Sequence, residues 1–220
     1  MAASDATFEV DGLATLITPN DDFYRIDTVL VVPRVDVESW RLRVTGMVEQ
    51  PIELSFEDLL AMSAREETMR LACVSNEVGG DLVGNAVWLG IPLAHVRARA
   101  GVLPEATQII ARSVDGSTVG FPTEVALDGR PSMVAVGMNG EPLPADPGFP
   151  ARMIIPGLYG YVSATKWLGE IELTTLEDFD ACWIRRGWAK RAPIKTQSRI
   201  DVPRVGRTID PGRAAVAGVA

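Results

Sequence analysis

One cysteine lies beside a glycine-rich loop, in a setting that can bind a metal or supply a nucleophile. Residues 70–90 read RLACVSNEVGGDLVGNAVWLG, and Cys73 follows a short apolar run that predicts a strand end. Gly79 and Gly80 let the backbone approach a bulky ligand closely. A thiolate at the mouth of such a loop suits a soft metal or nucleophilic attack. The alternative is a buried, inert cysteine beside an ordinary turn, since free cysteine is among the most buried residue types.

The sequence lacks the residues of several other active-site types. His95 is the single histidine and no G-x-S-x-G motif is present, so a serine hydrolase is disfavoured and His95 receives no role. Without a CxxC or a Cys/His cluster, a structural zinc site is disfavoured, and Cys182 is predicted to be structural. The glycine-rich loop lacks the Lys-Ser/Thr of a P-loop. No C-x-x-C-H motif occurs, so no haem is expected in this chain.

Composition and charge limit the possible partners. The 220 residues are 47% hydrophobic and 23% charged, which is typical of a globular protein of one or two domains. The net charge of −8 argues against nucleic-acid or anionic-membrane binding. Basic residues gather between 185 and 213, where a small anion could be held. No apolar run reaches the roughly 18 residues of a membrane span, and the acidic N-terminus does not resemble a signal peptide.

Short apolar runs bounded by turns predict an α+β fold in which strands predominate. The β-α-β rhythm of a doubly wound fold is missing. Ser55 is the expected N-cap of one helix, and a second helix is expected over Pro92–Gly101. Asn139-Gly140 is typical of a tight turn. Strands are predicted at 40–45, 109–114, 133–138, 153–155 and 168–173.

The chain divides into three segments. We expect residues 1–15 to be a lead-in, residues 16–200 to form the main domain, and residues 201–220 to differ from it. The last segment has proline-containing turns between β-like runs and ends within an alternating stretch, 215–219. We therefore expect that the chain is cut shortly after a second, all-β domain begins.

Several motifs, in order from about residue 16 to 203, resemble the molybdopterin-binding domain of the sulfite oxidase family. They are PNDDFYR (19–25), C-x-x-N (73–76), W-x-G-x-x-L, M-N-G-x-P-L-P, G-F-P-x-R, P-G-x-x-G and K-W-L (166–168). The resemblance implies mixed strand-rich sheets with short helices. It also implies oxygen-atom transfer at a molybdenum held by a pterin dithiolene and a cysteine thiolate. The TQSRIDVP run resembles the entry into the family's immunoglobulin-like dimerisation domain.

The resemblance assigns roles to individual residues. Cys73 corresponds to the metal ligand, and Arg25 and Trp188 correspond to other catalytic positions. Guanidinium and ammonium groups suit the anionic phosphate of the pterin. A carboxylate such as Asp115 suits the amino-pyrimidine. The cofactor-binding residues implied in this way are Phe23, Tyr24, Arg25, Asn76, Asp115, Arg152, Ser163, Thr165 and Lys166.

Four positions depart from the family pattern. Glu77 and Val78 stand where sulfite oxidases have two arginines, and a carboxylate there would repel sulfite. Trp188 replaces the active-site tyrosine, and an indole has no titratable hydroxyl with which to relay a proton. Pro147 replaces a histidine that precedes G-F-P. The cofactor is therefore expected, whereas sulfite is a doubtful substrate.

Three functions remain open. The first is a bacterial molybdopterin-dependent oxidoreductase with a small-molecule oxo donor or acceptor, such as a sulfoxide or N-oxide, and a separate electron-transfer partner. The second is sulfite oxidation, and the third is a non-catalytic assembly module. A Cys73 sulfur that shares a cleft with Arg25, Arg152 and Lys166 would favour an enzyme; an apolar setting would favour the module. The resemblance further implies a homodimer through the missing domain and an extracytoplasmic or membrane-anchored parent protein.

Overall fold

Two five-stranded sheets form the body of the computed structural model, which describes residues 10–220. Residues 1–9 of the expected lead-in lie outside the described residues. In the first sheet β1 and β10 are parallel and all other neighbours are antiparallel. The order of this sheet is β2 (Ile52–Ser55), β1 (Arg41–Gly46), β10 (Leu168–Thr174), β5 (Gln108–Ser113) and β6 (Thr118–Pro122).

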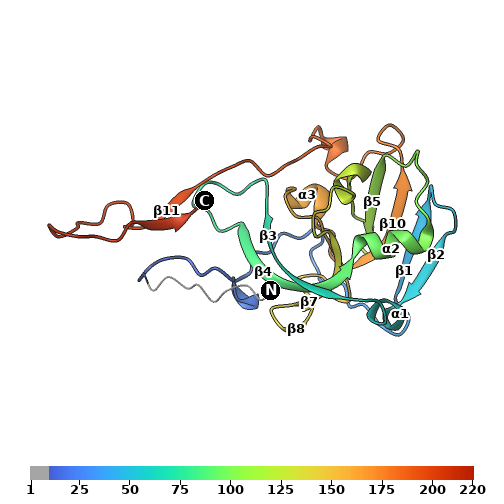
Figure 1. Ribbon diagram of the computed structural model, residues 1–220, viewed down its shortest axis with the longest axis horizontal. Helices are drawn as coiled ribbons and strands as arrows, with labels where there is room; N and C mark the ends of the chain where they lie inside the picture. The colour runs from blue at the N-terminus through green and yellow to red at the C-terminus, as the bar shows by residue number, and fades with distance from the viewer. Residues whose placement is uncertain (1–9) are drawn as a thin grey trace.

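The second sheet is antiparallel throughout, and its two longest strands curve across the molecule (Figure 1). A short strand, β9, also pairs with β7. The strands are β3 (Arg65–Ala72), β4 (Val83–Pro92), β7 (Met133–Met138), β8 (Glu141–Pro142) and β9 (Arg152–Ile154). The helices are short: α1 (Phe56–Leu60), α2 (Leu93–Ala100) and α3 (Gly160–Ser163). The expected strand-rich α+β architecture is confirmed.

Local signals explain several of these elements. Ser55 caps α1 in a capping box with Asp58, whose backbone N–H it accepts at 3.1 Å. Helix α2 ends at Ala100, and the C-cap residue Gly101 has a φ of 65°, which an L-side chain would rarely adopt. Asn139 and Gly140 both have positive φ, 52° and 79°, as the tight turn between β7 and β8 requires.

The core extends between the two sheets. Side chains of the first sheet such as Leu42 and Ile171 belong to one buried cluster with Ile91 and Val134 of the second sheet. A smaller cluster surrounds Trp88 and has two loop aromatics, Phe23 and Tyr24, packed against it. Burial of apolar surface on this scale is the main force that holds the sheets together. The smaller cluster forms the floor of the site described below.

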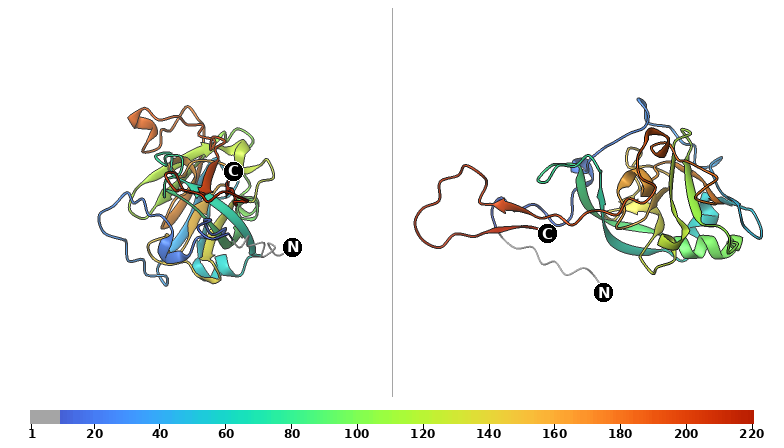
Figure 2. Two further views of the ribbon diagram at one scale, coloured as in Figure 1. Left: turned by 90° about the vertical axis from the view of Figure 1, so that its left-hand side faces the viewer. Right: turned by 90° about the horizontal axis from the view of Figure 1, so that it is seen from above.

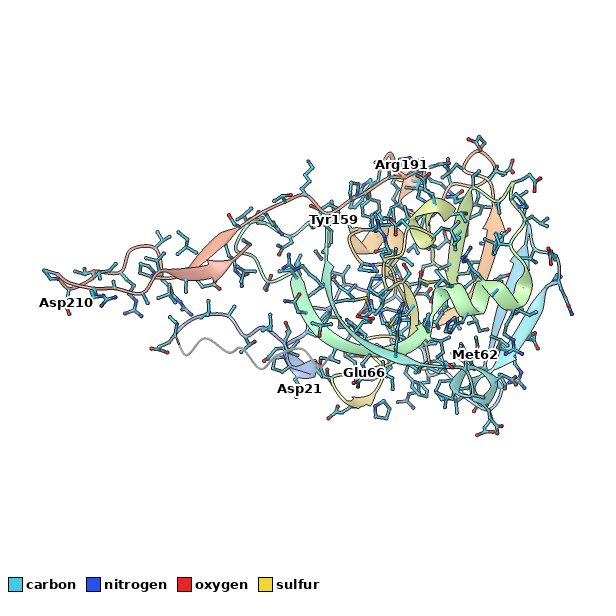
Figure 3. The ribbon with its side chains drawn as sticks, in the orientation of Figure 1. Asp21, Met62, Glu66, Tyr159, Arg191 and Asp210 are labelled. Atoms are coloured by element: carbon cyan, nitrogen blue, oxygen red, sulfur yellow. The ribbon has the colours of Figure 1, made fainter. Side chains whose placement is uncertain are left out.

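The C-terminal segment leaves the body of the molecule as a hairpin (Figures 1 and 2). Its strands, β11 (Arg199–Val202) and β12 (Ala217–Val219), pair only with each other in the described residues. Asp210 lies at its far tip (Figure 3). The start of a second domain at residue 201 stays a prediction. No helix within residues 10–220 is long and apolar enough to cross a membrane.

Candidate active site

Cys73 stands directly after β3, at the start of a loop that closes on itself. Its backbone N–H donates to the Leu82 carbonyl at 2.9 Å, and its carbonyl accepts the N–H of Asn76 at 3.1 Å. The Asn76 side-chain oxygen accepts the N–H of Leu82 at 2.8 Å. These bonds fix the backbone that carries the thiol. The Cys73 sulfur accepts only a weak contact, from the N–H of Ser75 at 3.4 Å, and the cysteine forms no disulfide.

A cavity of about 210 Å³ opens in front of Cys73. Its walls come from both sheets, from the loop around residue 23 and from the segment that follows β10. No Asp or Glu is among the lining residues. Of the three cations expected to share the cleft with Cys73, Arg152 and Lys166 line the cavity and Arg25 does not.

Arg152 is a buried cation at the start of β9. It is 4% exposed, and its Nη1 donates to the carbonyl of Pro147 at 2.9 Å. The guanidinium lies 5.1 Å from the ring centre of Trp88, a cation–π distance. Burial lowers the pKa of Arg152 to about 10, which still leaves it charged at neutral pH. Its Nε is buried without a hydrogen-bond partner in the described residues.

Arg152 and Cys73 have opposite effects on the pKa of Tyr24. Burial raises the pKa of its hydroxyl to about 12; the Arg152 charge opposes this increase and the Cys73 charge adds to it. The hydroxyl is therefore protonated at neutral pH. The ring stacks on Phe23 at 5.4 Å, and Phe23 meets Trp88 edge-on at 5.7 Å. Both aromatics line the cavity, and their contact with a pterin stays a prediction.

Thr165 and Lys166 come from the turn just before β10. The Thr165 hydroxyl is buried and has no partner in residues 10–220. Lys166 Nζ donates to Asp27 Oδ1 at 2.5 Å. Burial lowers the pKa of Lys166, and the Asp27 carboxylate opposes that change. Trp167 has a φ of 49°, its ring is buried, and its Nε1 donates to the Ala145 carbonyl at 2.8 Å.

Arg25 is held away from the cavity by two carboxylates. It pairs with Asp27, and its Nη1 lies 2.7 Å from Asp146 Oδ2. Asp27 therefore binds both Arg25 and Lys166. Its burial would raise the carboxyl pKa, but the hydrogen bonds from Lys166 and Arg25 outweigh burial, and the pKa falls below its ordinary value.

Three other expected cofactor contacts do not line the cavity. Asn76 uses its side-chain oxygen to close the Cys73 loop. Ser163 is fully buried, with its hydroxyl donating to the Leu158 and Tyr159 carbonyls at 3.1 and 3.0 Å. Asp115 accepts hydrogen bonds from Thr28 and Ser117, which do line the cavity. Burial would raise the Asp115 pKa, but these bonds lower it.

The segment after β10 supplies residues that sequence reasoning missed. Sequence analysis gives Cys182 a structural role and Trp183 none, and both line the cavity. Trp188, which the resemblance assigns to a catalytic position, lines it as well. Tyr159, labelled in Figure 3 at the start of α3, holds this segment: its N–H donates to the Ala192 carbonyl at 2.9 Å. No local motif links Cys182 to Cys73, so only the fold could place its thiol at the cavity.

The donor set fits an anionic cofactor that brings its own metal. Arg152 Nε and the Thr165 hydroxyl are two buried donors without partners on the cavity wall, as an anion of several oxygens needs. Cys73 offers a thiol in the same cavity. Within residues 10–220, no group of three or more His, Cys, Asp or Glu could hold a metal ion alone. Any metal at Cys73 would therefore need further ligands from a cofactor.

Comparison with known proteins agrees with this chemistry. The family model described as the oxidoreductase molybdopterin binding domain matches residues 29–183, more than half of the chain. The protein named "Uncharacterized oxidoreductase YuiH" of Bacillus subtilis is 36% identical over 156 residues, which cover 71% of this chain and 75% of that protein. The mitochondrial sulfite oxidase of Rattus norvegicus is 30% identical over 245 residues, covering 93% of this chain.

A solved structure shows the same kind of fold. The sulfane dehydrogenase SoxCD from Paracoccus pantotrophus matches with a TM-score of 0.73 and 25% identity, over 86% of this chain. The match covers 54% of the SoxCD chain, and this chain spans only 44% of the rat sulfite oxidase. The longer relatives therefore contain regions with no counterpart in these 220 residues.

Proposed function

Because the chain belongs to the family of oxidoreductase molybdopterin-binding domains, we propose that it is an enzyme of oxygen-atom transfer at a molybdenum bound by Cys73. The observation that carries this proposal is the shared cavity. One cavity is lined by Cys73, whose thiol is free, and by Arg152 and Thr165, whose Nε and hydroxyl are buried without partners in the described residues. A soft thiolate is the protein ligand expected for a sulfur-bound metal.

Different residues of the chain would bind different parts of the cofactor. The cofactor, when bound, supplies a centre for two-electron oxygen-atom transfer. Cys73 would bind the metal from a loop whose backbone is already closed. Arg152, Thr165 and Lys166 would donate hydrogen bonds to the cofactor phosphate. Tyr24, whose pKa of about 12 keeps its hydroxyl protonated, would donate a hydrogen bond rather than accept a proton.

The arrangement of charges favours a neutral substrate over sulfite. Arg25 is directed to Asp27 and Asp146 and lies outside the cavity lining. Glu77 and Val78, where sulfite oxidases carry arginines, are exposed. Arg152 and Lys166 would be occupied by the cofactor phosphate. A small oxo donor or acceptor without net charge would therefore meet no electrostatic penalty.

The other two functions have less support. Sulfite oxidation would require an anion to bind beside Cys73. The two cations that line the cavity, Arg152 and Lys166, would already bind the cofactor phosphate. The assembly module would leave a cavity, a free thiol and two partnerless buried donors without any use, although buried polar groups are normally paired. Electrons would pass to a separate carrier. A homodimer formed through a further C-terminal domain is part of the same proposal.

Metal analysis of matched cysteine variants tests the proposal. Protein made in a host that synthesises molybdopterin should carry about one molybdenum and one pterin per chain. Cys73→Ser should lose one sulfur from the metal's coordination shell, or the metal itself, in X-ray absorption and mass spectrometry. Cys182→Ser removes the other cavity thiol and is the control, so it should retain both metal and sulfur count. An unchanged sulfur count in Cys73→Ser would contradict the proposal.

A further inference from the structure

A second cavity, of about 150 Å³, lies on the opposite face of β3 from the cavity in front of Cys73. Successive side chains of a strand point to opposite faces of its sheet. Leu71 accordingly lines the first cavity, whereas Arg70 lines the second. The loop after β3 contributes to both, since Cys73 lines the first cavity and Asn76 and Gly79 line the second. The second cavity is therefore a separate site that the proposed function does not use.

The lining of the second cavity is largely polar and includes two arginines. Arg70 comes from β3, and Arg199 comes from β11 of the C-terminal hairpin. The uncharged polar residues of the lining are Thr15, Thr18, Asn76, Asn85, Gln197 and Ser198. In the part of the chain that the structure describes, no Asp or Glu lines this cavity. Two arginines would repel a cation, and an apolar ligand would leave the polar groups without partners, so the lining favours an anion.

Arg70 is half-buried and has no carboxylate partner within residues 10–220. Its one hydrogen bond there is long, from Nε to Asn85 Oδ1 at 3.4 Å. The Asn85 amide is held in place because its Nδ2 donates to the Leu16 carbonyl at 3.1 Å. The terminal Nη groups of Arg70 thus remain as donors. A guanidinium that has lost part of its water shell is stabilised by an anionic partner.

Arg199 is partly neutralised, and Asn76 supplies a further donor. Arg199 Nε is buried without a hydrogen bond in the described residues, although Asp201 Oδ1 forms an ion pair with it at 2.8 Å. Arg199 Nη1 donates to the Gly80 carbonyl at 3.4 Å, which joins the hairpin to the loop after β3. The Asn76 oxygen accepts the N–H of Leu82, so its NH2 group lies on the other side of the amide. Two arginines and one carboxylate leave a net charge of +1 at the cavity.

We propose that the second cavity binds a small oxyanion, of the class of phosphate and sulfate, between Arg70 and Arg199. Guanidinium groups form paired, charge-assisted hydrogen bonds with such anions. Arg199 belongs to the basic segment 185–213, which could hold a small anion. The ligand contacts β3, the loop after it and β11 together, so its binding fixes the hairpin to the body of the molecule. The site needs no molybdenum and does not rest on the proposed function.

Calorimetric titration with inorganic phosphate tests the site, on protein purified from a host that synthesises molybdopterin. Sodium chloride keeps the ionic strength constant, and the wild type should bind phosphate at a single class of site. Arg70→Gln removes the unpaired charge and keeps a polar side chain, so Kd should rise at least about tenfold, the effect of one lost hydrogen bond to a charged group. Arg70→Lys keeps the charge without the planar fork and should have an intermediate Kd. It gives a second measurement if Arg70→Gln does not fold.

Arg65 provides the matched control, because it stands on the same strand and does not line the second cavity. Arg65→Gln makes the same change of charge and should leave Kd close to the wild-type value. Equal weakening in Arg65→Gln and Arg70→Gln would reveal an effect of overall charge and overturn the assignment. A wild-type protein that binds no phosphate would also overturn it.

A third variant separates the two cavities. Lys166 lines the first cavity and not the second, so Lys166→Gln should leave the Arg70-dependent binding of phosphate intact. Phosphate binding that survives Arg70→Gln but is lost in Lys166→Gln would place the anion in the first cavity and overturn the assignment. Molybdenum content, measured on the same samples, reports on the proposed function separately.

Discussion

Arg152 is a buried cation with no carboxylate partner in the described residues. At 4% exposure its charge has lost nearly all contact with water, and an unpaired buried charge is costly. The Pro147 carbonyl and the Trp88 ring recover part of that cost. Pro147, which stands where the family has a histidine, thus still contributes through its backbone. An anion in the cavity would pair with the Arg152 charge and offset the rest of the cost of burying it.

Asp27 gives a prediction for the pH dependence of stability. Its pKa is lowered in the folded chain, so its contribution to stability is complete above the ordinary Asp pKa of about 3.9. That contribution should be lost as the pH falls through the lowered folded value. We expect Asp27→Asn to reduce the free energy of unfolding at pH 7, and the difference from wild type to shrink below about pH 4. Urea denaturation of both proteins across this range measures it.

Asp146 offers a matched control for this carboxylate. It contacts Arg25 but not Lys166, and its side chain is 52% exposed. Exposed ion pairs contribute about 0–1 kcal/mol, so Asp146→Asn should have the smaller effect at pH 7. Equal effects of the two substitutions would show that the bond from Asp27 to Lys166 adds no stability.

At the scale of elements, the contact between β4 and the loop around residue 23 positions the aromatic floor. A Cβ on Gly84 would lie 2.7 Å from the Phe23 ring, so only glycine allows this approach. Gly84→Ala should lower the free energy of unfolding by about 1–3 kcal/mol, the usual cost of overpacking. Gly169 is the control because its Cβ would have no neighbour closer than 3.4 Å. Urea denaturation curves of the two variants should differ, and matching curves would contradict the argument.

Helices and strands that have local sequence signals could be predicted. The contacts that bring the site residues together could not. Helix α2 follows from Pro92 and Gly101 at its ends, and β7 ends at the Asn139-Gly140 turn, because these signals act within a few residues. Contacts such as Lys166 to Asp27 join residues 139 apart. Only packing of the two sheets brings such pairs together.

The individual site residues show the same division. Motifs assign Arg152 and Lys166 to the cofactor, and both residues line the cavity. Cys182 belongs to no motif, and its segment folds back against α3 only in three dimensions. Arg25 was expected in the cavity, but neighbouring carboxylates hold it outside, an effect of charge that motif spacing does not record.

At the scale of the whole molecule, the cavity walls come from both sheets, so a ligand there would link them. A ligand at 100 times its Kd adds about 2.7 kcal/mol to the free energy of unfolding. For a chain of 220 residues this corresponds to a rise in Tm of about 5–10 °C. Calorimetry of cofactor-loaded and cofactor-free protein measures the difference. Equal melting temperatures would show that the cofactor does not bind the folded chain more tightly than the unfolded chain.

The loop that carries Cys73 has a consequence for how the enzyme would be assembled. Its backbone bonds to Leu82 and Asn76 are made within the loop itself. Cofactor binding would then be a single bimolecular step, because the loop needs no further folding. Its observed rate should increase in proportion to the amount of cofactor supplied, without a lag phase and without reaching a plateau set by slow refolding.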